Sequence, residues 1–152
     1  MSTAPSTAGK LYLVVGYDGS QPAVRALDAA VRLLHGRDGR IDVVYIAHPT
    51  AAEMMSANAL AEMEEIFDEM AQELRTQAGE QLRGLEDRWR FERRHGSISE
   101  ELLAAAAKVP DVAPEDTVVI VVGSSSQAVH RMVGSVAVSL ARHAPVPLVI
   151  VP

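Results

Sequence analysis

The segment LYLVVGYDGS, residues 11–20, joins an apolar run to a glycine-containing turn and decides the fold. Its first five residues are apolar without interruption, which is typical of a strand buried on both faces of a parallel sheet. Ser20 is placed to cap a helix that extends through Leu34, and Gly36 offers its end. A second apolar run, Ile41–Ala47, follows. The spacing therefore predicts a strand, a helix and a second strand in succession.

The rest of the chain repeats this alternation. The further predicted strands are Trp89–Arg94, Thr117–Val122 and Leu148–Val151. Helices are predicted between them, over a long segment after Pro49, from Ser97 or Ser99 to Lys108, and over about residues 130–143. This order favours an α/β fold of a single domain, an open parallel sheet with helices on both faces.

The long segment after Pro49 carries an apolar stripe with helical spacing. The stripe consists of Met63, Ile66, Phe67, Met70 and Leu74. We expect it to face the core, in a helix that is broken or bent near Gly79 or Gly84. The strand Trp89–Arg94 is charged and alternates only weakly, which favours the edge of the sheet.

Composition limits the classes of protein that the chain can represent. It has 152 residues, 48% of them hydrophobic, and a formal net charge of -6. We expect a flexible tail over residues 1–10 and one domain over 11–152. The 20 acidic residues outnumber 14 scattered basic ones, which argues against nucleic acid as a partner. The apolar runs are too short to span a membrane, and the chain contains no cysteine, so we expect a cytoplasmic protein.

Two turns that follow strands are candidates for a binding site, because ligands of open parallel sheets bind beyond the carboxyl ends of the strands. In the turn Gly16–Ser20, the Asp18 carboxylate can accept hydrogen bonds from a ligand. The alternative is that Asp18 only shapes the turn and Ser20 only caps the helix. The second turn contains Gly123, Ser124, Ser125 and Ser126, with Gly134 and Ser135 further on. Amides and hydroxyls before a helix suit an anion, although serines at such positions also serve as plain helix caps.

These turns and two further motifs resemble the universal stress protein family. The motifs are Leu13-Val14-Val15-Gly16-Tyr17-Asp18-Gly19-Ser20, His95-Gly96-Ser97, Val121-Val122-Gly123-Ser124 and the C-terminal His143-Ala144-Pro145-Val146-Pro147-Leu148-Val149-Ile150-Val151. The resemblance implies a Rossmann-like sheet of five strands in the order 3-2-1-4-5, with Asp18 facing the Gly123 loop across one crevice. Nucleotide-binding members of that family hold ATP there. By position, Ile46 is the counterpart of a second residue beside the adenine and ribose.

The chain departs from the phosphate loop of those members, which reads Gly-x-x-Gly, nine residues, then Gly-Ser or Gly-Thr. Ser126 stands in place of the second glycine, and only seven residues separate it from Gly134, so the loop is two residues short. The resemblance implies an adenine nucleotide such as ATP, with Mg²⁺ only as its companion. The nucleotide-binding residues it implies are Asp18, Ile46, Gly123, Ser124, Ser126, Gly134 and Ser135.

The altered loop favours an alternative from a different class, a homodimeric protein-interaction module that needs no nucleotide. With or without a nucleotide we expect a homodimer, because an apolar last strand, Leu148–Val151, would pair with a second copy about a two-fold axis. We expect no enzyme in either case, because the sequence has no Gly-x-Ser-x-Gly nucleophile motif. We also expect no metal site of the protein's own, since the five histidines lack the spacing of metal ligands.

Overall fold

The computed structural model describes residues 8–48, 55–124 and 134–152. Its strands are β1 (Leu11–Gly16), β2 (Gly39–Ala47), β3 (Trp89–His95), β4 (Thr117–Gly123) and β5 (Leu148–Val151). They form one parallel sheet in the order β3-β2-β1-β4-β5, which confirms the predicted fold class and strand order. The connections reverse direction between β1 and β4, and the carboxyl ends of these two central strands are where the topology leaves room for a ligand.

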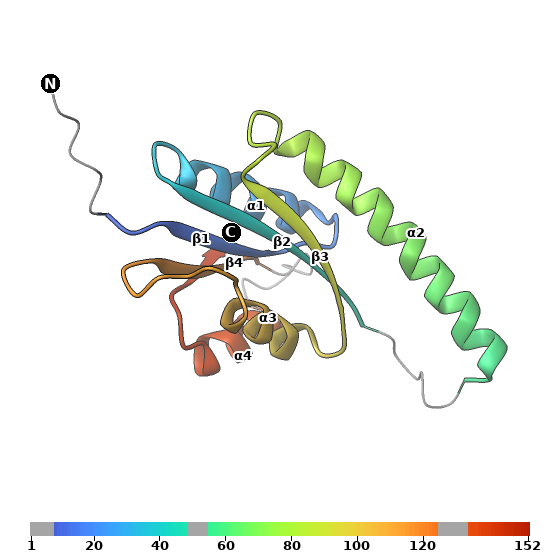
Figure 1. The fold of residues 1–152 in the computed structure, drawn as a ribbon. Coiled ribbons are helices and arrows are strands. Elements are labelled where there is room, and N and C mark those ends of the chain that lie inside the picture. The colour runs from blue at the N-terminus through green and yellow to red at the C-terminus, as the bar shows by residue number, and fades with distance from the viewer. Residues whose placement is uncertain (1–7, 49–54, 125–133) are drawn as a thin grey trace, which may run out of the picture.

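Helices cover both faces of the sheet, as Figure 1 shows. One face carries α1 (Gln21–Leu34) and α2 (Ala57–Gln81), and the other carries α3 (Ile98–Ala107) and α4 (Ser135–His143). The predicted cap of α1 is confirmed, because the Ser20 hydroxyl accepts a hydrogen bond from the Ala23 N–H at 3.4 Å. Helix α4 begins at Ser135, and the residues 130–133 of the longer helix predicted from sequence lie outside the described part.

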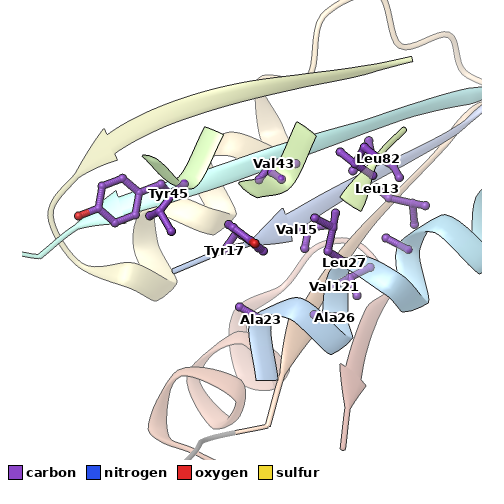
Figure 2. Packing of buried hydrophobic residues seen from close by; sticks show 14 of the residues in the cluster. Leu13, Val15, Tyr17, Ala23, Ala26, Leu27, Val43, Tyr45, Leu82 and Val121 are labelled. Carbon is purple, nitrogen blue, oxygen red and sulfur yellow. The ribbon is translucent and has the colours of Figure 1, made fainter. Parts of the chain in front are cut away.

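The core consists of two layers, one on each face of the sheet. Alternate residues of β1 serve the two layers, with Leu13 and Val15 under α1 and α2, and Val14 on the opposite face. Figure 2 shows the first layer, in which Leu13 and Val15 pack near Leu27 of α1. The second layer includes Leu102 of α3, which is also fully buried. Burial on both faces explains why the central strands read as continuous apolar runs.

Helix α2 follows the prediction only in part. It is not broken at Gly79, but it ends at Gln81, close to Gly84, the other position predicted for a break. The predicted stripe faces the core only in part. Leu74 is buried, but Ile66 and Met70 are 57% and 42% exposed. Phe67 of the same stripe packs against the core, whereas Ile66 and Met70 lie on a flank of the helix that turns to solvent.

Strand β3 lies at an edge, as its charged sequence predicts. Its Trp89 and Phe91 pack against the core under α1 and α2. The alternate residue Arg90 lies on the other face, where its guanidinium is 2.8 Å from the carboxylate of the buried Asp42. Arg40 binds the same carboxylate at 2.7 Å. Two arginines thus neutralise the buried carboxylate at this edge of the sheet.

The N-terminal segment reaches the sheet at Lys10, whose backbone N–H donates to the Asp116 carboxylate at 2.7 Å. Residues 1–7 of the predicted tail lie outside the described part.

In the three described stretches of chain, no helix combines the length and the apolar character that crossing a membrane requires.

Candidate functional site

A cavity of about 250 Å³ opens where the chain reverses direction between β1 and β4. Six of the seven residues predicted from sequence line it, namely Asp18, Ile46, Gly123, Ser124, Gly134 and Ser135. The seventh, Ser126, lies outside the described residues. The six come from four separate segments, and they meet because parallel strands present their carboxyl ends, and the turns that follow, at one edge of the sheet.

Asp18 lies in a tight turn that its own side chain helps to hold. Its Oδ1 atom accepts a hydrogen bond from the Ser20 N–H at 2.9 Å, and Gly19 takes the left-handed conformation with φ +78°. The turn-forming role considered from sequence is therefore present. The hydrogen bond occupies one carboxylate oxygen, and the exposed side chain of Asp18 still lines the cavity.

Gly123 is required by the packing of the chain itself. A Cβ atom at this position would lie 2.3 Å from the carbonyl oxygen of Pro22 and 2.7 Å from its Cβ. The end of β4 therefore passes against the first turn of α1, and no larger residue fits without a shift of backbone. This close approach is a reason for the glycine that involves no ligand.

Ser124 has its backbone amide already engaged. The amide donates to the carbonyl oxygen of Val151 at 2.8 Å, which extends the pairing of β4 with β5. An anion in the cavity can therefore use the hydroxyl of Ser124 but not its N–H. The sequence motif did not reveal this, because the partner lies at the far end of the chain.

The start of α4 contributes backbone N–H donors to the cavity. Gly134 is the N-cap residue and provides no side-chain cap, and the first hydrogen bond of the helix runs from the Val138 N–H to the Gly134 carbonyl at 3.1 Å. The preceding N–H groups of the helix, beginning with that of Ser135, therefore have no partner within its hydrogen-bond ladder. Together with the helix dipole they make this corner of the cavity favourable for a negative charge.

Much of the remaining wall is apolar. It includes Val44 and Ile46 of β2, Leu102 of α3 and Val122 of β4. Sequence reasoning identified only Ile46. Val44 and Val122 follow from the alternation of side chains along their strands once the cavity face is known, whereas nothing local to the sequence marks Leu102. Among the described lining residues only Asp18 is charged.

Tyr17 connects this turn to α2. Its hydroxyl donates to Gln81 Oε1 at 3.4 Å, and the amide nitrogen of Gln81 donates to the Val24 carbonyl at 2.8 Å and to Asp28 at 2.9 Å. Burial raises the pKa of the Tyr17 hydroxyl above its usual value, and the carboxylates of Asp18 and Asp28 raise it further. The hydroxyl therefore stays protonated and acts as a donor that holds the turn in place.

Comparison with known proteins gives a consistent result. The model of the universal stress protein family matches residues 12–152. The universal stress protein UspA from Lactobacillus plantarum is similar in structure, with a TM-score of 0.76, 19% identity, and coverage of 95% of this chain and 99% of that one. A search of curated proteins found no match.

Two of the similar structures are described as nucleotide complexes. One is a universal stress protein in complex with cAMP, with a TM-score of 0.64, 20% identity, and coverage of 95% of this chain and 99% of that one. The other is the universal stress protein from Archaeoglobus fulgidus in complex with dAMP, with a TM-score of 0.56, 16% identity, and coverage of 95% and 98%. At these identities the similarity concerns the fold.

Proposed function

Because this chain belongs to the universal stress protein family, we propose that it is a regulatory stress-response module that binds an adenine nucleotide in the cavity between β1 and β4. The observation that carries the proposal is the convergence of a carboxylate, an apolar slot and an uncapped helix start in one cavity. These three features suit a ribose, a base and a phosphate, respectively. The cAMP and dAMP complexes of two structural neighbours support the same class of ligand.

Each part of the nucleotide has a place in this proposal. The base lies in the apolar slot beside Ile46 and Leu102, and the ribose hydroxyls donate to the carboxylate of Asp18. The phosphate accepts hydrogen bonds from the N–H groups in the first turn of α4 and from the hydroxyl of Ser135. Gly123 lets the end of β4 pass beside α1 at the edge of the cavity, Gly134 leaves the start of α4 open to the ligand, and the hydroxyls of Ser124 and Ser126 complete the set of donors.

The charge of the phosphates determines the role proposed for Mg²⁺. The described lining residues include no cation, so a triphosphate would bring several negative charges to a cavity that already holds Asp18. We therefore infer that Mg²⁺ enters only with a di- or triphosphate and is bound mainly by its oxygens. A monophosphate needs no such companion, because the helix start and the hydroxyls suffice for a smaller charge.

The test begins with the purified protein. Denaturation followed by mass spectrometry identifies any nucleotide that was retained, and calorimetric titration with AMP and ATP, with and without Mg²⁺, measures affinity. We expect Asp18→Asn to weaken binding by about 10- to 100-fold, which corresponds to one charged hydrogen bond. Asp87→Asn serves as the matched control, because Asp87 is exposed and does not line the cavity. Unchanged binding by the Asp18 variant, or no binding of any adenine nucleotide, would contradict the proposal.

The second candidate is a homodimeric interaction module that needs no nucleotide. Two observations favour it, because the packing of Gly123 against Pro22 and the hydrogen bond between Asp18 and Ser20 each explain a motif residue without a ligand. Its dimer would form through β5, an apolar edge strand, since the opposite edge strand β3 carries charges that oppose pairing. Because a dimer is expected for either candidate, partner binding distinguishes them: partner binding that persists in nucleotide-free Asp18→Asn protein favours the second candidate, and its loss counts against it.

We infer no catalytic role for the cavity. Asp18 is the only carboxylate among the described lining residues, the hydroxyl of Tyr17 is bonded to Gln81, and a single exposed carboxylate supplies no paired acid and base. A cytoplasmic location stays a prediction, with which the absence of cysteine from the sequence is compatible.

A further inference from the structure

The N-terminal half of α2 presents apolar side chains that the domain does not cover. No residue between 57 and 70 is buried, whereas Ala71, Leu74 and Ala78 in the second half pack into the core. Ile66 is 57% exposed and Met70 is 42% exposed. These two residues are four positions apart and lie next to each other on one flank of the helix. Large apolar residues at such spacing on a helix mark a surface suited to another helix.

Carboxylates border this apolar pair. Glu62, Glu69 and Glu73 occur four or three positions from Ile66 or Met70, which places them on the same flank. We call these three glutamates, together with Ile66 and Met70, the Ile66 stripe. It shares only Ile66 and Met70 with the apolar stripe predicted from the sequence. In the part of the chain that the structure describes, none of these three glutamates forms a salt bridge. The stripe therefore combines an exposed apolar centre with a border of uncompensated negative charge.

The opposite flank of the same helix is held by the domain. Arg93 of β3 binds Glu64 at 3.0 Å and also binds Asp68. The hydroxyl of the buried Tyr45 donates to the sulfur of Met70 at 3.1 Å, which ties the inner edge of the stripe to β2. These contacts fix the helix on one side and leave the Ile66 stripe open on the other. The stripe is thus displayed on an anchored helix rather than on a free one.

The charge of the segment decides what can cover it. Residues 57–74 contain six carboxylates and no basic residue. A second copy of the chain would bring two such segments together, and like charges at short distance oppose that contact. We propose that the Ile66 stripe binds a basic, amphipathic helical segment of a partner protein. Apolar side chains of the segment contact Ile66 and Met70, and its lysines or arginines pair with the bordering glutamates. This inference does not depend on nucleotide binding.

The experiment uses a synthetic probe, because the partner's sequence is not needed to test the chemistry. The probe is a fluorescent helical peptide of about 18 residues, with leucines at every third or fourth position and lysines elsewhere. Anisotropy measures its binding to the full-length protein. Two control peptides replace the lysines with glutamates or scramble the order so that the apolar face is lost. We expect saturable binding of the first peptide only, weakened when NaCl is raised from about 50 to about 500 mM.

Variants of the protein then locate the binding surface. We expect Ile66→Ser, and separately the triple change Glu62→Gln, Glu69→Gln and Glu73→Gln, to weaken binding at least about tenfold. Leu33→Ser is the matched control, because Leu33 is exposed to the same 42% as Met70 but lies on α1. Since all substituted side chains are exposed, circular dichroism should show unchanged folding.

Three outcomes would overturn the proposal. They are equal binding of the scrambled peptide, binding that both stripe variants retain, and self-association that Ile66→Ser abolishes in the absence of any peptide binding. The last result would make a second copy the occupant of the stripe.

Discussion

Replacing Gly123 by alanine separates the needs of the fold from those of a ligand. The added Cβ would lie 2.3 Å from the carbonyl oxygen and 2.5 Å from the carbonyl carbon of Pro22. Both are backbone atoms in the first turn of α1, so no side-chain rotation relieves the contact. Either β4 or α1 must move, although the two elements share a well-packed core layer.

The expected magnitude follows from this geometry. Overpacking typically lowers the free energy of unfolding by about 1–3 kcal/mol, and a clash with backbone belongs at the upper end. For a domain of this length, about 2–3 kcal/mol corresponds to a fall in Tm of roughly 4–12 °C. We expect this loss in protein that contains no nucleotide.

The assay is thermal and urea unfolding of the nucleotide-free variant, with Gly79→Ala measured beside it. Gly79 lies inside α2, and its added Cβ would be 3.4 Å from the Trp89 ring, which is ordinary contact. There the same chemical change should stabilise the protein by about 0.5–1 kcal/mol, because alanine loses less backbone freedom in a helix. A Gly123→Ala variant that keeps its Tm and loses only nucleotide affinity would refute the packing argument and leave the ligand as the reason for this glycine.

Three further changes test other parts of the structure. Asp42→Ala should lower the free energy of unfolding in urea by about 3 kcal/mol. This is the lower end of the range for a broken buried ion pair, because the side chains of Arg40 and Arg90 are 24% and 38% exposed and regain water. A loss below about 1 kcal/mol would contradict this. Hydrogen bonds from two backbone N–H groups hold the pKa of Asp116 below its usual 3.8, so the folded protein binds fewer protons than the unfolded chain, and stability should fall as the pH drops below about 4. Asp116→Asn should make that acid dependence shallower, and an unchanged slope would count against it. Arg93→Leu should speed amide hydrogen exchange in residues 57–70. It should change global stability by only about 1 kcal/mol, since the carboxylates that Arg93 binds, Glu64 and Asp68, are 53% and 65% exposed. Exchange as slow as in the wild type would show that the ion pairs do not anchor α2.

Gly123 and Asp18 also show why a motif can persist for more than one reason. The glycine lets β4 pass beside α1, and the aspartate closes the turn that starts α1. A nucleotide-binding site can therefore use residues that the fold already requires. For the same reason, loss of stability in a variant of either residue does not by itself demonstrate loss of a ligand contact, and the affinity must be measured on folded protein.

The sequence by itself determined the architecture. Uninterrupted apolar runs such as Leu11–Val15 mark strands covered on both faces, and the apolar spacing after Ser20 marks a helix, because these patterns reflect the geometry of the two elements directly. The position of the candidate site also followed, since turns after parallel strands share one edge of the sheet. The strand order came from the motifs of a family, which carry topological information that periodicity lacks.

Only the tertiary structure decided which of those residues are free to bind. The amide of Ser124 is bonded to Val151, the space beside Gly123 is filled by Pro22, and Leu102 lines the cavity from a position in α3 that no motif marks. The exposure of Ile66 and Met70 likewise depends on which flank of α2 the domain contacts, since Phe67 beside them packs against the core. These contacts and exposures depend on residues far apart in the chain. The local sequence pattern does not predict them, because the distances between such residues are set only when the helices and strands pack together.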